Sequence, residues 1–245
     1  MFSAAELFSA EFDNPNFIIP GFVPEGITLL SGTPKIGKSW MILGMGVAVA
    51  TGGSVFSDVG CNKTDVLYLA LEDSPRRLGS RLRVMLGWDN PPPNFMLTCE
   101  WPRFPAGTKM LDQWLEKHPS TKLVMIDTLE MVRPPRRSNP YEDDYRALVG
   151  LRELATKHRV AFVVVHHNRK SSTQSDGTEI DPMERVSGTM GLTGSVDNIL
   201  VLSRVRGTRL GELMVMGRDV KEQKLVLRLD EDLGLWVKHE QGVRA

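Results

Sequence analysis

Eight consecutive residues carry the strongest chemical signal in the sequence. Gly32 to Ser39 reads GTPKIGKS and matches the pattern G-x-x-x-x-G-K-[ST], directly after an apolar run and directly before a stretch of helical length. Glycines let the backbone turn tightly and bring its N–H groups onto phosphate oxygens, and the start of the next helix adds the positive end of its dipole. The pattern therefore predicts a phosphate loop (residues 32–39) that binds a nucleotide.

The positions of this loop have distinct expected parts. Lys38 should reach the β- and γ-phosphates, and the Ser39 hydroxyl should be a ligand of Mg²⁺. The other expected nucleotide-binding residues are Gly32, Thr33, Pro34, Lys35, Ile36, Gly37 and Trp40. ATP and Mg²⁺ are the implied cofactors. A glycine-rich turn without a ligand is the alternative, and the strand–loop–helix context disfavours it.

Two further apolar runs end in acidic residues. The run KLVMID ends at Asp127 and is typical of the second nucleotide motif, whose carboxylate holds the metal through water. The run DVLYLAL is followed by Glu72, which could polarise the attacking water as a general base. Asp73 or Ser74 is instead expected to cap the following helix.

Another apolar run, VAFVVV, is followed by two histidines and an asparagine. A polar side chain at this point could sense the γ-phosphate of a bound nucleotide. His166 and His167 would point to opposite faces of a strand, because side chains alternate along it, so they form no obvious metal pair. The residues alone leave a sensor role and an ordinary structural role open for either histidine.

These motifs need a framework that brings the ends of several strands together. Apolar runs alternate with stretches of helical length, which predicts an α/β fold with a mostly parallel sheet flanked by helices. The expected strands are 26–31, 65–71, 95–99, 122–127, 160–166 and 195–203, and the expected helices are 38–51, 74–86, 108–117 and 141–158. The later runs LMVMG, KLVLRLD and GLWVK predict antiparallel hairpins at the C-terminal edge of the sheet.

Composition narrows the function classes. The 245 residues contain 30 Lys plus Arg and 30 Asp plus Glu, so any contact with a polyanion must be local rather than spread over a basic surface. Two cysteines are too few for a disulfide framework and fit a reducing, cytoplasmic setting. No apolar run reaches the roughly 18 residues of a spanning helix, and the acidic start MFSAAELFSAEFDNP is unlike a signal peptide. We therefore expect neither export nor a membrane anchor.

Five segments in this order resemble a known family. They are PGFVPEGITLLSGTPKIGKS, LYLALEDSPRRLGSRL, LVMIDTLEMV, VVVHHNRK and SGTMGLTGSVDNILVLSR. Together they resemble the RecA-like core of the plasmid RepA group of hexameric replicative helicases, over roughly residues 17–229. DnaB-type helicases and RecA recombinases share this core more distantly. The resemblance implies a RecA-like P-loop ATPase domain over residues 17–245, preceded by an N-terminal arm, residues 1–16.

The resemblance also implies residue roles. It makes Glu72 the catalytic glutamate and agrees with the metal-side role of Asp127. It assigns the γ-phosphate sensor to His166 or His167, and the spacing to Asn168 selects His167.

Hexameric members of this group complete each nucleotide site with an arginine from the neighbouring subunit. Arg218, in the late hairpin region, is the candidate here, and Arg204 and Arg206 are alternatives. A guanidinium inserted from the next subunit stabilises charge that develops on the transferred phosphoryl group. An ordinary surface arginine is the competing interpretation of Arg218.

Single-stranded DNA is the partner that the resemblance implies. Residues 169–189 align with a loop that faces the central channel of such rings, and residues 131–140 form a second polar connection after a strand. The basic residues of these two loops are Arg133, Arg136, Arg137, Arg169 and Lys170. Six copies would concentrate this charge, although four acidic residues dilute the second loop.

The predicted function is that of an ATP-dependent ring helicase, a homo-hexamer that moves on single-stranded DNA during replication, with an initiator or primase as a candidate partner. A recombinase-like or regulatory ATPase switch without unwinding activity is the main alternative. A kinase built on the same loop is the third class, and it leaves Glu72 and the late hairpins without a role.

Overall fold

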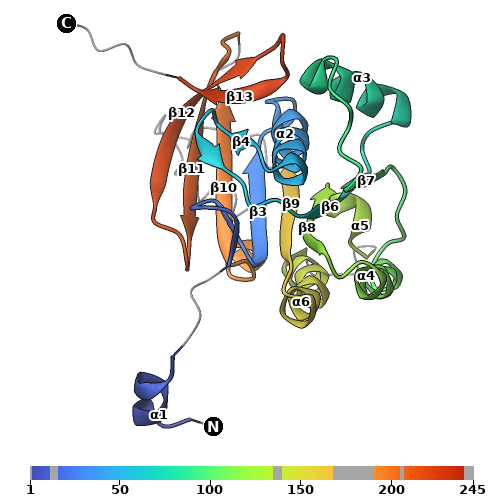
Figure 1. The fold of residues 1–245 in the computed structure, drawn as a ribbon. Helices are drawn as coiled ribbons and strands as arrows, with labels where there is room; N and C mark the ends of the chain where they lie inside the picture. The colour runs from blue at the N-terminus through green and yellow to red at the C-terminus, as the bar shows by residue number, and fades with distance from the viewer. Residues whose placement is uncertain (1, 12–15, 135–139, 168–189, 205–206, 240–245) are drawn as a thin grey trace, which may run out of the picture.

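A nine-stranded sheet forms the centre of the molecule (Figure 1). The computed structural model describes residues 2–11, 16–134, 140–167, 190–204 and 207–239. The strand order is β13-β12-β11-β10-β3-β9-β8-β6-β7. Its parallel strands are β3 (Gly26–Gly32), β6 (Asp65–Ala70), β7 (Phe95–Thr98), β8 (Thr121–Asp127), β9 (Ala161–His167) and β10 (Asn198–Arg204). Each overlaps a strand predicted from its apolar run, so the parallel core is confirmed.

An antiparallel extension continues the sheet beyond β10. It consists of β11 (Leu210–Gly217), β12 (Gln223–Asp230) and β13 (Leu235–Lys238), each paired antiparallel with the strand before it. These strands contain the three late alternating runs apart from Gly234, which lies before β13, so the predicted hairpins at the C-terminal edge are also confirmed.

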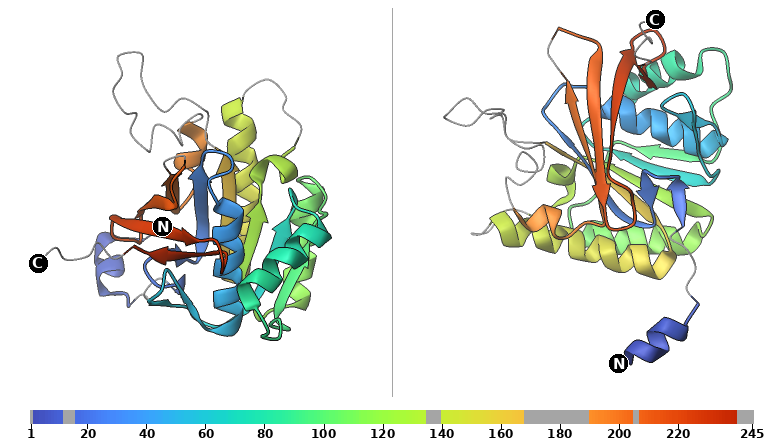
Figure 2. Two further views of the ribbon diagram at one scale, coloured as in Figure 1. Left: turned by 90° about the horizontal axis from the view of Figure 1, so that it is seen from above. Right: turned by 90° about the vertical axis from the view of Figure 1, so that its left-hand side faces the viewer.

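Helices cover both faces of the sheet (Figure 2). One face packs against α2 (Lys38–Thr51) and α3 (Pro75–Leu86). The other packs against α4 (Ala106–Lys117), α5 (Leu129–Val132), α6 (Pro140–His158) and α8 (Met190–Thr193). The central strands are therefore buried on both sides, which explains why their sequences are continuous apolar runs rather than alternating ones.

Shorter elements complete the fold. Strand β1 (Phe17–Ile19) pairs with β2 (Val23–Pro24), and β4 (Ser54–Val55) pairs with β5 (Val59–Gly60). Helix α1 (Ala4–Ser9) begins with a capping box between Ser3 and Glu6, and none of its residues is buried. It lies apart from the sheet (Figure 1). No helix in the described part of the chain is long and apolar enough to cross a membrane.

Candidate nucleotide-binding and catalytic site

The register of the sheet brings the predicted motifs to one edge. Strands β3 and β9 end together, with Gly32 opposite His167. Strands β6 and β8 also end together, with Ala70 opposite Asp127. Since β9 and β8 are themselves neighbours, the phosphate loop, His167, Asp127 and the turn after β6 meet at the carboxyl ends of four adjacent strands. This is the edge where open α/β sheets bind ligands.

The phosphate loop turns sharply into α2. Gly37 is left-handed, with φ 105°, and a Cβ there would lie 2.9 Å from the Trp236 ring, so both conformation and space favour glycine. The Trp236 indole Nε1 donates to the Gly37 carbonyl at 3.1 Å. Pro34 and Lys35 are exposed at the tip, whereas Ile36 is buried. Strand β13 thus supports the phosphate loop through the contact of Trp236 with Gly37.

Lys38 lies at the start of α2 and is only 4% exposed. Its Nζ donates to the carbonyls of Gly32 at 2.7 Å and Thr33 at 2.9 Å. Burial lowers the pKa of Lys38 to about 8, and the nearby carboxylates of Asp127 and Glu72 partly oppose this shift. The ammonium is therefore charged at neutral pH and held by loop carbonyls, within the loop that would receive phosphate oxygens.

Asp127 ends β8 and is also only 4% exposed. Its carboxylate accepts a hydrogen bond from Tyr68 Oη at 3.1 Å and another from the Ser39 hydroxyl. Burial raises the pKa of Asp127, and these two hydrogen bonds oppose the shift. The site therefore pairs a carboxylate with a hydroxyl, the hard oxygen donors that suit Mg²⁺.

The donor set of Ser39 and Asp127 fits Mg²⁺ bound together with phosphate. Among the described residues, no group of three or more His, Cys, Asp and Glu side chains could hold a metal by itself. Mg²⁺ keeps several waters and is usually bound by one or two carboxylates plus substrate phosphates. The chemistry of this pair matches that type of site.

Glu72 lies in the turn after β6 and is an accessible carboxylate at this edge, with a side chain 42% exposed. Its Oε1 accepts a hydrogen bond from Thr128 Oγ1 at 2.8 Å, and its Oε2 lies 3.3 Å from His167 Nε2. The other ring nitrogen, His167 Nδ1, is buried and has no hydrogen-bond partner among the described residues. A fixed but accessible carboxylate of this kind can accept a proton from water.

Trp40 follows the loop in the first turn of α2. The guanidinium of Arg81 in α3 lies over its ring, 5.2 Å from the centroid. Gly234 packs closely against the same ring, because a Cβ there would lie 2.3 Å from it. Trp40 is thus beside the phosphate loop, with neighbours from α3 and from the turn before β13.

The candidate arginines lie at two different edges. Arg218 follows β11, and its guanidinium lies 3.7 Å from the Asp197 carboxylate, at the edge opposite the phosphate loop. Its own chain therefore does not bring it to the site. Arg204 ends β10 on the same edge as the loop, and its guanidinium lies 6.0 Å from the centroid of the Trp236 ring. Arg206 lies outside the described residues.

One basic residue of the predicted DNA-facing loops is wrongly assigned. Arg133 is buried after α5, with a side chain 3% exposed and paired with Glu130. The loop expected from residue 131 begins in fact with the end of this short helix. The remaining basic residues of both predicted loops, Arg136, Arg137, Arg169 and Lys170, lie outside the described residues, as does the segment 169–189.

Two site residues are missing from the sequence prediction. Tyr68 lies inside an apolar strand, and Thr128 directly follows the second nucleotide motif. A phenol in a buried strand needs a hydrogen-bond partner, which is a usable signal for Tyr68. Its partner could not be named, because β6 and β8 are neighbours only in the folded sheet.

For Ser74, the structure confirms the expected cap of α3, since its Oγ accepts from the Arg77 N–H.

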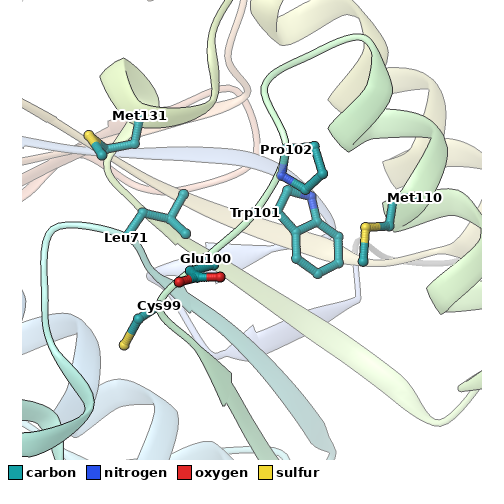
Figure 3. A pocket seen from close by; sticks show the side chains of 7 residues that line it. All are labelled: Leu71, Cys99, Glu100, Trp101, Pro102, Met110 and Met131. Atoms are coloured by element: carbon teal, nitrogen blue, oxygen red, sulfur yellow. The ribbon is translucent and has the colours of Figure 1, made fainter.

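A separate hollow of about 550 Å³ borders the same edge (Figure 3). Leu71 and Met131 line one part of it, and Trp101 and Met110 line another, with Glu100 as its carboxylate. The lining carries no basic side chain that would attract phosphate. The hollow is therefore distinct from the phosphate site.

Comparison with known proteins gives both a family and a fold. A sequence profile described as "AAA domain" matches residues 1–173. One solved structure, that of an ATPase domain, aligns with a TM-score of 0.72 at 16% identity, over 96% of this chain and 95% of that one. A DnaB-like replicative helicase, from a structure that also concerns its interactions with primase, aligns with a TM-score of 0.72 at 16% identity, over 96% of this chain and 66% of that one.

A recombinase shares the fold as well. The RadB recombinase aligns with a TM-score of 0.59 at 20% identity, over 90% of this chain and 93% of that one. Comparison with curated protein sequences gives no match. The structural matches confirm the RecA-like α/β fold that the ordered motifs predict.

Proposed function

The chain belongs to the AAA domain family, and on this premise we propose that it is the ATP-hydrolysing subunit of a ring helicase that moves on single-stranded DNA during replication. The carrying observation is the convergence of Lys38, Asp127 and Glu72 at one edge of the sheet, each from a different strand end. These are the three charges that phosphate binding, metal binding and water activation require.

Binding of the triphosphate is the first proposed step. The N–H groups of the phosphate loop and the start of α2 surround the phosphates, and the Lys38 ammonium exchanges the carbonyls of Gly32 and Thr33 for phosphate oxygens. Ser39 and Asp127 would hold Mg²⁺, which supplies positive charge that neutralises the phosphate oxygens. Tyr68 keeps the Asp127 carboxylate oriented.

Proton transfer from water is the second step. Glu72 accepts the proton, and the Thr128 hydroxyl fixes the orientation of its carboxylate. His167 contacts Glu72 through Nε2, and its buried Nδ1, which has no partner among the described residues, is proposed to become accessible to a γ-phosphate oxygen when nucleotide binds. Loss of the γ-phosphate therefore removes one hydrogen bond from the imidazole that contacts the base, which makes His167 rather than His166 the proposed sensor.

Assembly completes the proposed site. Arg218 is exposed at the far edge of its own sheet, and this exposure leaves it accessible to a neighbouring subunit. In a homo-hexamer, each of six nucleotide sites would be paired with Arg218 of a neighbouring subunit around a central channel. Residues 169–189 are the proposed DNA-contacting loop. Residues 1–16 are the proposed arm before the ATPase domain of residues 17–245. An initiator or primase is a proposed partner. The proposed location is the cytoplasm, where ATP and DNA are both present.

The test is steady-state ATP hydrolysis with and without single-stranded DNA, on protein whose mass is measured by light scattering. We expect a multi-subunit species whose turnover rises with DNA, and Lys38→Ala as an inactive blank. Wild-type hydrolysis that DNA leaves unchanged would refute the DNA motor. Normal turnover by Lys38→Ala would refute the site itself.

A DNA-associated ATPase switch without unwinding is the second candidate. The observation in its favour is the RadB recombinase match, which covers 90% of this chain and 93% of that one. Its TM-score of 0.59 is below the 0.72 shared by the ATPase domain and the DnaB-like helicase. DNA-stimulated hydrolysis together with filaments instead of closed rings would favour this candidate.

A further inference from the structure

Asp73, the residue after Glu72, is held by an unusually complete set of donors. Its side chain is only 8% exposed. Oδ1 accepts from the Ser74 N–H at 2.9 Å and from Arg77 Nε, and Oδ2 accepts from Arg81 Nη1. Both arginines come from α3, one turn apart, so this helix fixes the position of the Asp73 carboxylate.

Arg77 connects this carboxylate to the backbone of Glu72. While its Nε donates to Asp73, its Nη2 donates to the Glu72 carbonyl at 3.0 Å. On the other side, the Glu72 N–H donates to the Asp127 carbonyl at 3.3 Å. The peptide groups on both sides of the Glu72 Cα are therefore held, one by α3 and the other by β8.

Arg81 extends the connection to the phosphate loop. Its guanidinium donates to Asp73 and also lies 5.2 Å from the centroid of the Trp40 ring. Trp40 follows Ser39 in the first turn of α2. A continuous chain of contacts thus runs from the end of the phosphate loop through Trp40, Arg81, Asp73 and Arg77 to the backbone of Glu72.

We propose that Asp73 and Arg77 are positioning residues for Glu72, and that Arg81 couples their position to the first turn of α2. This inference rests on the proposed function, in which Glu72 activates water. Capping of α3 does not account for the arrangement, because the Ser74 hydroxyl already accepts from the Arg77 N–H at 3.4 Å. The bond from Arg77 to the Glu72 carbonyl has no part in that cap.

The first test compares Arg77→Ala with Arg76→Ala in the full chain. Arg76 is the preceding exposed arginine of α3, and the described structure gives its side chain no ion pair or hydrogen bond. Since a small displacement of a catalytic group slows chemistry more than binding, we expect Arg77→Ala to lower kcat about ten-fold with KM for ATP nearly unchanged. Arg76→Ala should leave both constants at the wild-type values. Wild-type kcat in Arg77→Ala would overturn the proposal.

A second test asks whether the effect acts through Glu72. In single-turnover measurements, adding Arg77→Ala to Glu72→Gln should cause no further loss, because the positioned base is already absent. An additive ten-fold loss, about the size in the single variant, would overturn the positioning role. Asp73→Asn, which keeps the size of the side chain and an acceptor for Ser74, repeats both tests if Arg77→Ala does not fold.

These measurements separate the inference from the function on which it rests. Normal turnover by Glu72→Gln would refute the proposed base, whatever Arg77 does. Loss of turnover in Glu72→Gln together with normal turnover in Arg77→Ala would refute only the positioning role.

Discussion

The carboxyl edge of the parallel strands and the antiparallel extension β11–β13 differ in how exposed their charged side chains are. At the carboxyl edge, Lys38 and Asp127 are each 4% exposed and are hydrogen-bonded within the chain. Arg218, at the end of β11, has a side chain 63% exposed and 3.7 Å from Asp197. One region is organised before any ligand arrives, whereas the other presents a cation to solvent.

The difference shows which parts of the chemistry one chain can complete. Buried, hydrogen-bonded charges need little reorganisation when a phosphate binds, which is the basis of electrostatic catalysis. An exposed ion pair contributes little to stability and can exchange partners at low cost. This contrast agrees with the proposal that phosphate, metal and water bind at the carboxyl edge and that the extension contacts a neighbour's nucleotide.

Among the variants that leave the phosphate loop intact, removal of Arg218 should have the largest effect. Because an arginine supplied by a neighbour stabilises charge in phosphoryl transfer, Arg218→Ala should lower kcat about 1000-fold in the assembled protein. Arg209→Ala, which removes another exposed arginine directly before β11, should leave kcat unchanged. Steady-state hydrolysis measures both.

Mixed oligomers decide whether Arg218 acts across subunits. Arg218→Ala retains an intact phosphate loop, and Lys38→Ala retains the arginine, so mixing the two inactive variants should restore part of the activity. If activity does not recover in particles shown to contain both variants, Arg218 does not act on the nucleotide of a neighbouring subunit.

Removal of Glu72, the carboxylate proposed to activate water, should have the next largest effect. Glu72→Gln should lower kcat about 100-fold, because a general base contributes at least this much, while the affinity for a fluorescent ATP analogue stays unchanged. The control is Glu100→Gln, which neutralises a carboxylate of the neighbouring hollow (Figure 3). Equal losses in the two variants would mean that Glu72 has no special role.

The buried lysine predicts a pH dependence of binding. Since burial lowers the pKa of Lys38 to about 8, the ammonium loses its proton as pH rises through that value, and its attraction to phosphate is lost. Affinity for a nucleotide analogue should fall about ten-fold per pH unit above pH 8. Titrations between about pH 7 and 10 measure this, with Lys38→Ala as a weak, pH-independent control. A constant wild-type affinity would contradict the assignment.

The smallest effect concerns stability. Burial raises the pKa of Asp127, so its ionised form is less favourable in the folded protein than in the unfolded chain at neutral pH. Asp127→Asn keeps an acceptor for Tyr68 and removes this cost, and it should raise the nucleotide-free Tm by about 2–4 °C. Thermal unfolding at neutral pH measures the shift, and a lower Tm would show that the charge stabilises the fold.

Much of the framework could be predicted because its signals are local. The phosphate loop lies within eight residues, and each parallel strand is an apolar run with a turn behind it. The strand order is not local, since β6 lies between β8 and β7. That order creates the hydrogen bond from Tyr68 to Asp127 and the contact between Glu72 and His167, which join residues 59 and 95 positions apart.

The contacts of charged residues are the hardest property to predict. Arg133 belongs to the basic run RPPRR, which favours a solvated loop. In the structure its side chain is buried directly after α5 and paired with Glu130. Arg77 and Arg81 have the spacing of an ordinary exposed helix face. Only the position of α3 over the turn after β6 makes them partners of Asp73.

Strand separation tests the central claim most directly. The substrate is a forked DNA duplex with a fluorescent strand, incubated with ATP and with protein whose oligomeric mass is known. We expect ATP-dependent release of the strand by the wild-type protein and none by Glu72→Gln. DNA-stimulated ATP hydrolysis by a closed ring without strand release would contradict the helicase and leave the ATPase switch.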